Sequence, residues 1–244
     1  MRGGDRVPCE LCRERDEKDR LNSLPWWARE SRVPPMTLLV AYRTGRKVLF
    51  WGDGQGLVQT LSDPYTAPGP LENVCKVLPC GRSNGLMWGF AGSNKIGLTL
   101  DHQLKDFDPS NWMDAKDTLE TMICGIVRTR RQKIKDSGAD PDHSGLETYF
   151  LFAGSIGTET KVLRVGKDGL GEWDQGDPSL SVEGLGANTF RILWAVNEAL
   201  HADDPIDQPE FFAKVCETFV RQCDGLHNGG SLWVHSAGSW SEHE

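Results

Sequence analysis

The sequence predicts an α+β protein built as a four-layer sandwich, with two antiparallel sheets packed face to face and a helix pair on each outer side. The expected elements follow the order strands, two helices, strands, two helices, strand. Three segments place apolar residues at helical spacings of three and four, at 119–127, 192–200 and 211–220. Stacked sheets with outer helices would bury all three apolar stripes, which is why this arrangement is expected.

The first strands are the clearest of these elements. Residues 37–43 and 47–53 are rich in β-branched and large apolar side chains and are separated by a Gly-containing turn, so they predict a hairpin. Residues 54–72 are rich in Gly, Pro, Ser and Asp and predict an excursion without secondary structure. Two more strands are expected at about 74–79 and 85–91.

Two helices should follow these strands. Ser93 can cap a helix that runs to about Phe107. A longer helix is expected over about 113–135, because Leu119, Ile123 and their apolar neighbours fall on one face. The other face of that helix is basic.

After a polar loop at 136–146, three strands are expected at about 147–154, 160–166 and 170–174. The turn around Ser155 is close to the elbow of serine hydrolases, but that elbow joins a strand to a helix, and a strand pattern follows here. A hairpin turn is therefore the favoured interpretation.

The last part of the chain should contain two helices and one strand. The first helix is expected at about 186–201. The second should start near Asp207, because Asp207 and Glu210 are spaced like a capping box, and a final strand is expected at about 230–236.

Length and composition favour one folded domain with an unusual start. The 244 residues are 38% hydrophobic and 25% charged, which is typical of a globular chain. Residues 1–36 are dense in charge and end near Pro34-Pro35, so we interpret them as a tail or propeptide before a domain at 37–244. Cys9 and Cys12 form one C-x-x-C pair there; a structural zinc would need a second ligand pair, which does not follow nearby.

Charge and cysteine usage exclude several function classes. The net charge of −8 argues against nucleic acid or an anionic membrane as the main partner. No apolar run approaches the roughly 20 residues of a membrane helix, and the N-terminus lacks the apolar core of a signal peptide. Seven cysteines without a compact disulfide pattern favour a reducing cytoplasm. The six histidines show no metal-binding spacing, and we expect neither a metal nor another cofactor.

Four residues near the start of the expected domain form a recognisable series. Thr37 opens the first strand and Asp53 ends the second, sixteen positions later. Lys76 lies in the third apolar run, and Gly92 precedes Ser93 at the expected helix start. This order resembles the start of the proteasome-type N-terminal-nucleophile (Ntn) hydrolases, and the resemblance extends by element order over nearly all of residues 37–240. The family resemblance implies the same four-layer sandwich.

The resemblance implies a catalytic role for each of these positions. Thr37 would be the nucleophile and its own α-amine the base, because a threonine hydroxyl needs a base and a free α-amine has a pKa of about 7.7–8.0. Lys76 would lower that pKa, Asp53 would keep the lysine charged, and the Gly92 N–H would hold the oxyanion. We therefore expect an ion pair between Asp53 and Lys76 beside Thr37. Asp224 would help to orient the threonine amine and a water.

Each of these residues also has an ordinary structural explanation. Thr37 is a β-branched residue that can start a strand, Asp53 can belong to a turn, and Lys76 can be a solvated strand position. The shared order of the landmarks and the spacing of the first pair favour the catalytic interpretation over three separate coincidences.

Later landmarks of the family are altered in this chain. The family usually has a Gly-Ser-Gly-Ser turn before its third helix, whereas this chain has Gly184-Leu185-Gly186-Ala187. The serine that usually follows Asp224 is replaced by His227 or Asn228. These missing hydroxyls put catalysis in doubt and keep a second function open.

Exposure of the Thr37 amine needs an explanation as well, because Thr37 is internal. Self-cleavage in this family commonly follows a glycine, whereas Met36 precedes Thr37. If translation starts at Met36, removal of that methionine would expose Thr37, and residues 1–35 would not belong to the working protein.

Two functions from different classes therefore remain. The first is a threonine-type endopeptidase that cleaves peptides or unfolded proteins inside a homo-oligomeric ring, with an ATP-dependent unfoldase as a candidate partner. The second is an inactive proteasome-like subunit with an assembly or binding role.

Overall fold

A computed structural model describes most of the chain beyond residue 37. The described residues are 38–53, 55–56, 72–73, 76–82, 85–138, 148–184, 205–224 and 230–243. They form two antiparallel five-stranded sheets, a two-stranded ladder and three helices. The tail at 1–36, Thr37 and the helix expected at 186–201 lie outside these residues, so the domain boundary after residue 36 stays a prediction.

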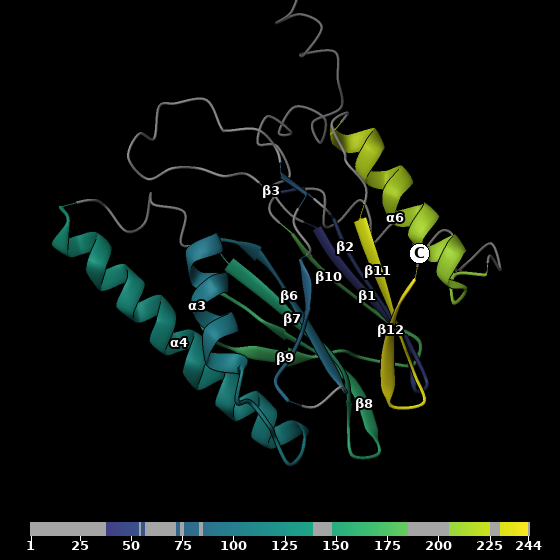
Figure 1. Ribbon diagram of the computed structural model, residues 1–244, viewed down its shortest axis with the longest axis horizontal. Helices are drawn as coiled ribbons and strands as arrows, with labels where there is room; N and C mark the ends of the chain where they lie inside the picture. Colours follow the sequence, from purple (N-terminus) through teal and green to yellow (C-terminus); the bar gives the residue numbers. More distant parts are fainter. Residues whose placement is uncertain are drawn as a thin grey trace, which may run out of the picture. The chain divides into compact units, whose positions relative to one another are not determined.

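The first sheet has the strand order β10-β1-β2-β11-β12 (Figure 1). Its strands are β1 (Leu38–Thr44), β2 (Lys47–Asp53), β10 (Ser179–Gly184), β11 (Gly230–Ser236) and β12 (Ser239–His243). The hairpin β1–β2 turns at Gly45, where φ is +57° and glycine is favoured. Pairing β11 with β2 places Gly230 opposite Asp53, so the end of β2 lies inside the sheet rather than at its edge.

The second sheet has the order β5-β6-β7-β8-β9. Its strands are β5 (Val77–Pro79), β6 (Leu86–Gly92), β7 (Thr148–Ile156), β8 (Glu159–Val165) and β9 (Gly171–Trp173). Consecutive strands pair as hairpins, except that the helices α3 (Asn94–Leu104) and α4 (Trp112–Asp136) separate β6 from β7. Ser155 lies in β7, and a turn at Gly157 and Thr158 joins β7 to β8, as the hairpin interpretation predicts.

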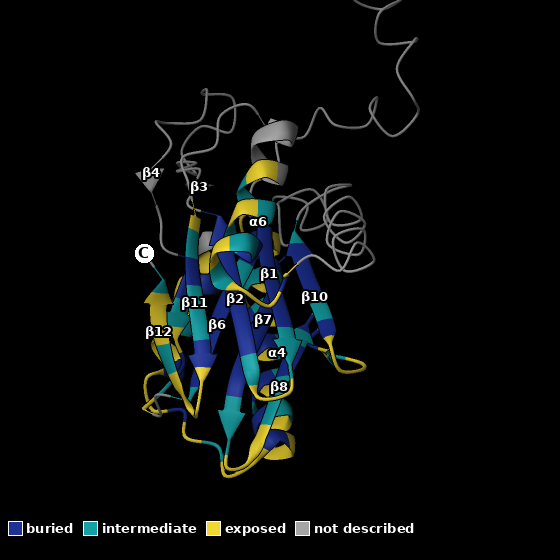
Figure 2. Cartoon of the chain, turned by 90° about the vertical axis from the view of Figure 1, so that its right-hand side faces the viewer, coloured by how far each residue is buried: buried dark blue, intermediate teal, exposed yellow. Residues whose placement is uncertain are grey.

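Apolar packing stacks these elements in four layers. Side chains of α3 and α4 pack with the second sheet, and α6 (Pro209–Asp224) packs on the first sheet. A separate cluster fills the space between the sheets and includes Leu39 and Phe50 from one side and Val77 and Leu151 from the other. Figure 2 shows the result: the central strands are buried, whereas β12 at the edge is largely exposed. The predicted α+β sandwich is confirmed.

Tryptophan and phenylalanine rings fill the second sheet's helical side. Trp88 stacks with Phe90, Phe150 and Phe152 at centroid distances of 5.8, 6.4 and 6.1 Å. Such aromatic pairs add to the free energy gained from burying their area.

No helix within the described ranges is long and apolar enough to span a membrane.

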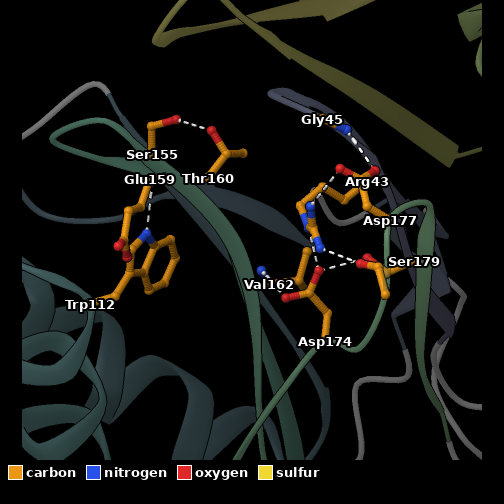
Figure 3. Close-up of polar contacts among 11 residues, drawn as sticks. Arg43, Gly45, Trp112, Ser155, Glu159, Thr160, Val162, Asp174, Asp177 and Ser179 are labelled. Carbon is orange, nitrogen blue, oxygen red and sulfur yellow. Dashed lines mark hydrogen bonds and ion pairs between the residues drawn. The ribbon is translucent and has the colours of Figure 1, made fainter.

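A polar cluster fixes the far end of β1 to the chain between β9 and β10 (Figure 3). The Arg43 guanidinium binds the Asp174 carboxylate through Nε and donates through Nη2 to the Gly176 carbonyl at 2.6 Å. Asp174 also accepts from the Ser179 hydroxyl at 2.6 Å and from the Val162 N–H at 3.1 Å. Asp174 therefore links the two sheets, because Arg43 belongs to β1 of the first sheet and Val162 belongs to β8 of the second.

The structure differs from the sequence expectations at several places. Strands β10 and β12 were not expected. The excursion at 54–72 begins and ends in the short ladder of β3 (Gln55–Gly56) and β4 (Glu72–Asn73). Helix α6 starts at Pro209, two residues after Asp207, near which its start was expected. Proline suits the first helical position because no N–H is needed there.

Candidate active site

The candidate site begins with Asp53, the last residue of β2. Its side chain is 2% exposed. The Leu38 N–H donates a hydrogen bond to Asp53 Oδ2 at 3.1 Å. This bond ties the first described residue of β1 to the end of β2, and Leu38 is bonded directly to Thr37.

Lys76, just before β5, brings the opposite charge to the same carboxylate. Its Nζ forms an ion pair with Asp53 Oδ1, and its side chain is 6% exposed. Burial lowers the pKa of Lys76, while the charge of Asp53 and its hydrogen bond oppose that shift. The predicted ion pair is present, and the two oxygens of one carboxylate contact the lysine and the Leu38 backbone.

Two glycines allow close packing around Lys76. Between the two sheets, a Cβ atom at Gly52 would lie 2.9 Å from Val77 Cγ2. Within the second sheet, a Cβ atom at Gly89 would lie 2.7 Å from the Lys76 carbonyl oxygen, because Gly89 pairs with Val77 of the neighbouring strand. Contacts under 3.0 Å force a neighbour to move. Gly89 was not singled out in the sequence; the signal that could have found it is a glycine inside an otherwise large-residue strand, Leu-Met-Trp-Gly-Phe.

Gly92 ends β6 and leads into α3 through Ser93. Its φ is +127°, a conformation that side-chain-bearing residues rarely adopt. The Ser93 N–H donates to Thr148 Oγ1 at 3.1 Å, and Thr148 is fully buried. Ser93 precedes the helix as predicted, but its side chain makes no capping hydrogen bond. The sequence had not singled out Thr148, whose hydroxyl holds the Ser93 N–H at this junction.

The side chains of the remaining predicted residues are not described by the structure. Asp224 is the last residue of α6, and nothing is described of its side chain. Thr37, the turn at 185–187, His227 and Asn228 lie outside the described residues. The structure therefore brings Asp53, Lys76 and the Leu38 N–H together, and it places Gly92 at the junction of β6 and α3.

Searches found no matching family model and no matching curated protein. Solved structures do match the coordinates. Anbu (ancestral beta-subunit) from Yersinia bercovieri is similar at a TM-score of 0.57 and 17% identity, over 84% of this chain and 86% of that one. Anbu from Hyphomicrobium sp. strain MC1 matches at 0.56 and 16% identity, over 85% of each chain. Eukaryotic HslV from Trypanosoma brucei matches at 0.51 and 16% identity, over 82% of this chain and 99% of that one.

Anbu and HslV are proteasome-type Ntn hydrolases. This chain has the proteasome-type Ntn hydrolase fold. The match spans most of both partners, so the resemblance at the start of the sequence extends to the whole sandwich. Within this proteasome-type fold, the Asp53 carboxylate of the buried Asp53–Lys76 pair accepts the N–H of Leu38, the residue that follows Thr37 in the sequence.

Proposed function

We propose that this chain is a proteasome-like subunit that hydrolyses peptide bonds with Thr37 as its nucleophile. The observation that supports the proposal most strongly is the double contact of Asp53, which binds Lys76 through Oδ1 and the Leu38 N–H through Oδ2. A carboxylate shared in this way holds a cation beside the segment to which Thr37 is attached. If Thr37 only started a strand and Lys76 were only a solvated strand residue, neither contact of Asp53 would be needed.

Covalent geometry brings Thr37 close to this centre. The carbonyl carbon of Thr37 is bonded to the Leu38 nitrogen at about 1.33 Å. The Leu38 nitrogen lies 3.1 Å from Asp53 Oδ2. The Lys76 ammonium would then act on a free Thr37 amine, because a nearby cation lowers the pKa of an amine by like-charge repulsion.

The reaction would proceed in two steps. The Thr37 Oγ attacks the carbonyl carbon of the substrate, its proton passes to the free α-amine, and the amide C–N bond breaks as that proton reaches the leaving nitrogen. A water then attacks the resulting ester, releases the carboxylate product and restores the hydroxyl. No cofactor takes part in either step.

The junction between β6 and α3 is suited to the negative charge that forms during attack. Backbone N–H groups at the start of a helix carry partial positive charge, so they stabilise an oxyanion. Gly92 lies at this junction, and the buried Thr148 hydroxyl fixes the neighbouring Ser93 N–H. We assign the oxyanion contact to the Gly92 N–H and the positioning role to Thr148.

The proposal requires a free amine at Thr37. While Met36 is attached, the Thr37 nitrogen is an amide and cannot accept a proton. Removal of Met36 after translation from that codon, or cleavage before Thr37, would create the base. Residues 1–36 then act as a propeptide or are absent from the working protein.

An inactive subunit with an assembly or binding role is the second candidate. Leu185, Ala187, His227 and Asn228 stand where the family usually carries hydroxyl side chains or their neighbours, and this substitution pattern favours loss of catalysis. The buried ion pair would then serve only the packing of the two sheets.

The proposed setting follows from the fold. Anbu and HslV are ring-forming peptidases, and a ring of identical subunits would confine cleavage to peptides and unfolded chains that enter it. An ATP-dependent unfoldase is the candidate partner for folded substrates. A reducing cytoplasm suits the free Cys80, Cys124 and Cys216 of the described ranges.

The test compares two forms of the protein, the full chain and a form that begins at Met36. Each is assayed with a fluorogenic peptide library, and its N-terminus is read by mass spectrometry. We expect cleavage only where Thr37 is the first residue, and no cleavage after Thr37→Ala. A confirmed free Thr37 in assembled protein without cleavage would favour the inactive subunit.

A further inference from the structure

The outer face of the α3–α4 layer carries an open groove of about 700 Å³ between the two helices. Leu98, Met122 and Ile126 contribute apolar side chains to it, and Lys95, Arg130 and Lys133 contribute cations. Leu98 is 68% exposed and lines the groove together with Met122 and Ile126. No part of the described structure fills this groove.

Gly125 lies in the groove at the middle of α4. The helix runs over 25 residues from Trp112 to Asp136, so Gly125 is one position past its midpoint. A glycine inside a helix costs about 1 kcal/mol relative to alanine. A Cβ at Gly125 would meet nothing within 4 Å, so the chain's own packing does not require the glycine. A small residue at this place allows another backbone to approach.

The two halves of α4 carry opposite charge. The half before Gly125 holds three carboxylates and one lysine, and the half after it holds five cations and one carboxylate. Asp117 and Lys133 lie eight residues on either side of Gly125, are both exposed, and make no ion pair with any described residue. A helix with this charge pattern is complementary to itself in the antiparallel direction.

We propose that a second copy of this chain docks here, with the two α4 helices crossing antiparallel about a two-fold axis at Gly125. The contact row is Asp117, Thr121, Gly125, Thr129 and Lys133, spaced by four residues. Rows of this spacing pack against each other in the commonest helix–helix class, with a crossing angle near −50°. The row of one copy then runs beside the reversed row of the other.

In this register Gly125 faces Gly125, Thr121 faces Thr129, and Asp117 faces Lys133. A two-fold contact repeats each pair, as an isologous interface requires. The exposed Leu98 and the half-buried Met122 supply apolar side chains that fill the groove of the partner. The contact adds a two-fold interface to the oligomer expected above and does not depend on the chemistry of Thr37.

Self-cross-linking at residue 125 tests the axis directly. Gly125→Cys in a Cys124→Ser background is oxidised mildly, and tryptic peptides are analysed by mass spectrometry. We expect a disulfide between two copies of residue 125, because a disulfide needs Cα atoms about 4.4–6.8 Å apart. Lys214→Cys, exposed on α6, is the matched control and should give no linkage to itself. The same result is expected with Thr37→Ala, which separates this proposal from the proposed function.

Two further variants test what holds the contact. Gly125→Gln fills the space at the axis, favours the helix and should weaken self-association at least tenfold in sedimentation velocity. At concentrations where both proteins are monomeric, its thermal stability should not fall below that of the wild type. Lys133→Glu should weaken self-association similarly, and Asp117→Lys in the same chain should restore it. Absence of the 125–125 disulfide, linkage of residue 125 to residues 1–36 instead, or unchanged sedimentation of Gly125→Gln would each overturn the proposal.

Discussion

The carboxylate of Asp53 and the ammonium of Lys76 form an ion pair inside the protein, where the two side chains are 2% and 6% exposed. The second oxygen of that carboxylate accepts the Leu38 N–H. Residues from β1, from the end of β2 and from just before β5 therefore meet at one carboxylate.

Removing the carboxylate charge should destabilise the fold strongly. Asp53→Asn removes the carboxylate charge from the buried pair with Lys76, and breaking a buried ion pair costs about 3–5 kcal/mol. Chemical denaturation should show a loss of that order. Asp106→Asn is the control, because the Arg82–Asp106 pair is 72% and 80% exposed and such pairs contribute at most about 1 kcal/mol.

Combining Asp53→Asn with Lys76→Met should recover much of this loss. The double variant buries no charge, and apolar replacements of a buried pair are often neutral or better. Losses that simply add, measured in a double-mutant cycle, would mean that the two side chains do not interact in solution. Peptide cleavage should stay absent in the recovered protein, which separates stability from activity.

The glycines beside Lys76 should be intolerant of a single methyl group. Gly89→Ala places a Cβ 2.7 Å from the Lys76 carbonyl oxygen, and overpacking of this kind costs about 1–3 kcal/mol. Gly125→Ala is the matched control at concentrations where the protein is monomeric, because its Cβ meets nothing within the chain and alanine favours a helix by up to about 1 kcal/mol. Thermal melts should move in opposite directions for the two variants.

Asp174 should matter far more than its neighbour Asp177. Asp174→Ala leaves the Val162 N–H and the Ser179 hydroxyl without their acceptor and removes the partner of Arg43, so a loss of about 2–4 kcal/mol is expected. The Asp177 side chain is 51% exposed, and Asp177→Ala should cost about 1 kcal/mol or less. Equal urea midpoints for the two variants would contradict the role given to Asp174.

His235 should make the fold sensitive to mild acid. It is fully buried, its Nδ1–H donates to the Arg46 carbonyl at 3.1 Å, and its ring lies 5.1 Å from that of Trp240. Burial lowers the pKa of His235 below 6.5, so the folded state prefers the neutral ring. The unfolded chain takes up the proton first, and stability is lost as pH falls below about 6.5 toward the folded pKa.

The measurement is the urea midpoint between pH 7.5 and pH 5. The wild type should lose up to about 1.4 kcal/mol per pH unit from this residue. His235→Gln should be less stable at neutral pH but should show a flatter dependence on pH. Parallel pH profiles for the two proteins would show that His235 does not carry the acid sensitivity.

Much of the fold could be predicted from the sequence, because most elements carry a strong period. The apolar stripe of 119–127 identified α4, and the alternation of strand and turn residues identified the hairpins of β1–β2 and β7–β8. Strand β12 reads Ser-Trp-Ser-Glu-His and lies at an exposed edge, so it lacks a buried face to mark it. Strand β10 begins after Pro178 and reads Ser-Leu-Ser-Val-Glu-Gly, in which buried serines weaken the apolar pattern.

Part of the candidate site could also be predicted from the sequence. Asp53 and Lys76 were found through the order of landmarks, and their ion pair is present. Thr148 and Gly89 were missed because their importance comes from contacts across strands: a hydrogen bond to the Ser93 N–H and a close approach to the Lys76 backbone. No local pattern encodes such contacts, which depend on the pairing of β6 with β5 and β7.

Covalent trapping at Thr37 tests the central claim most directly. Protein that begins at a confirmed free Thr37 is mixed with an activated peptide ester, quenched in acid within the first turnover and digested for mass spectrometry. The account predicts an acyl group on the Thr37 peptide, formed in a burst, and none in Thr37→Ala. Ester or peptide hydrolysis that continues unchanged in Thr37→Ala, or an acyl group on another residue of the active protein, would contradict it.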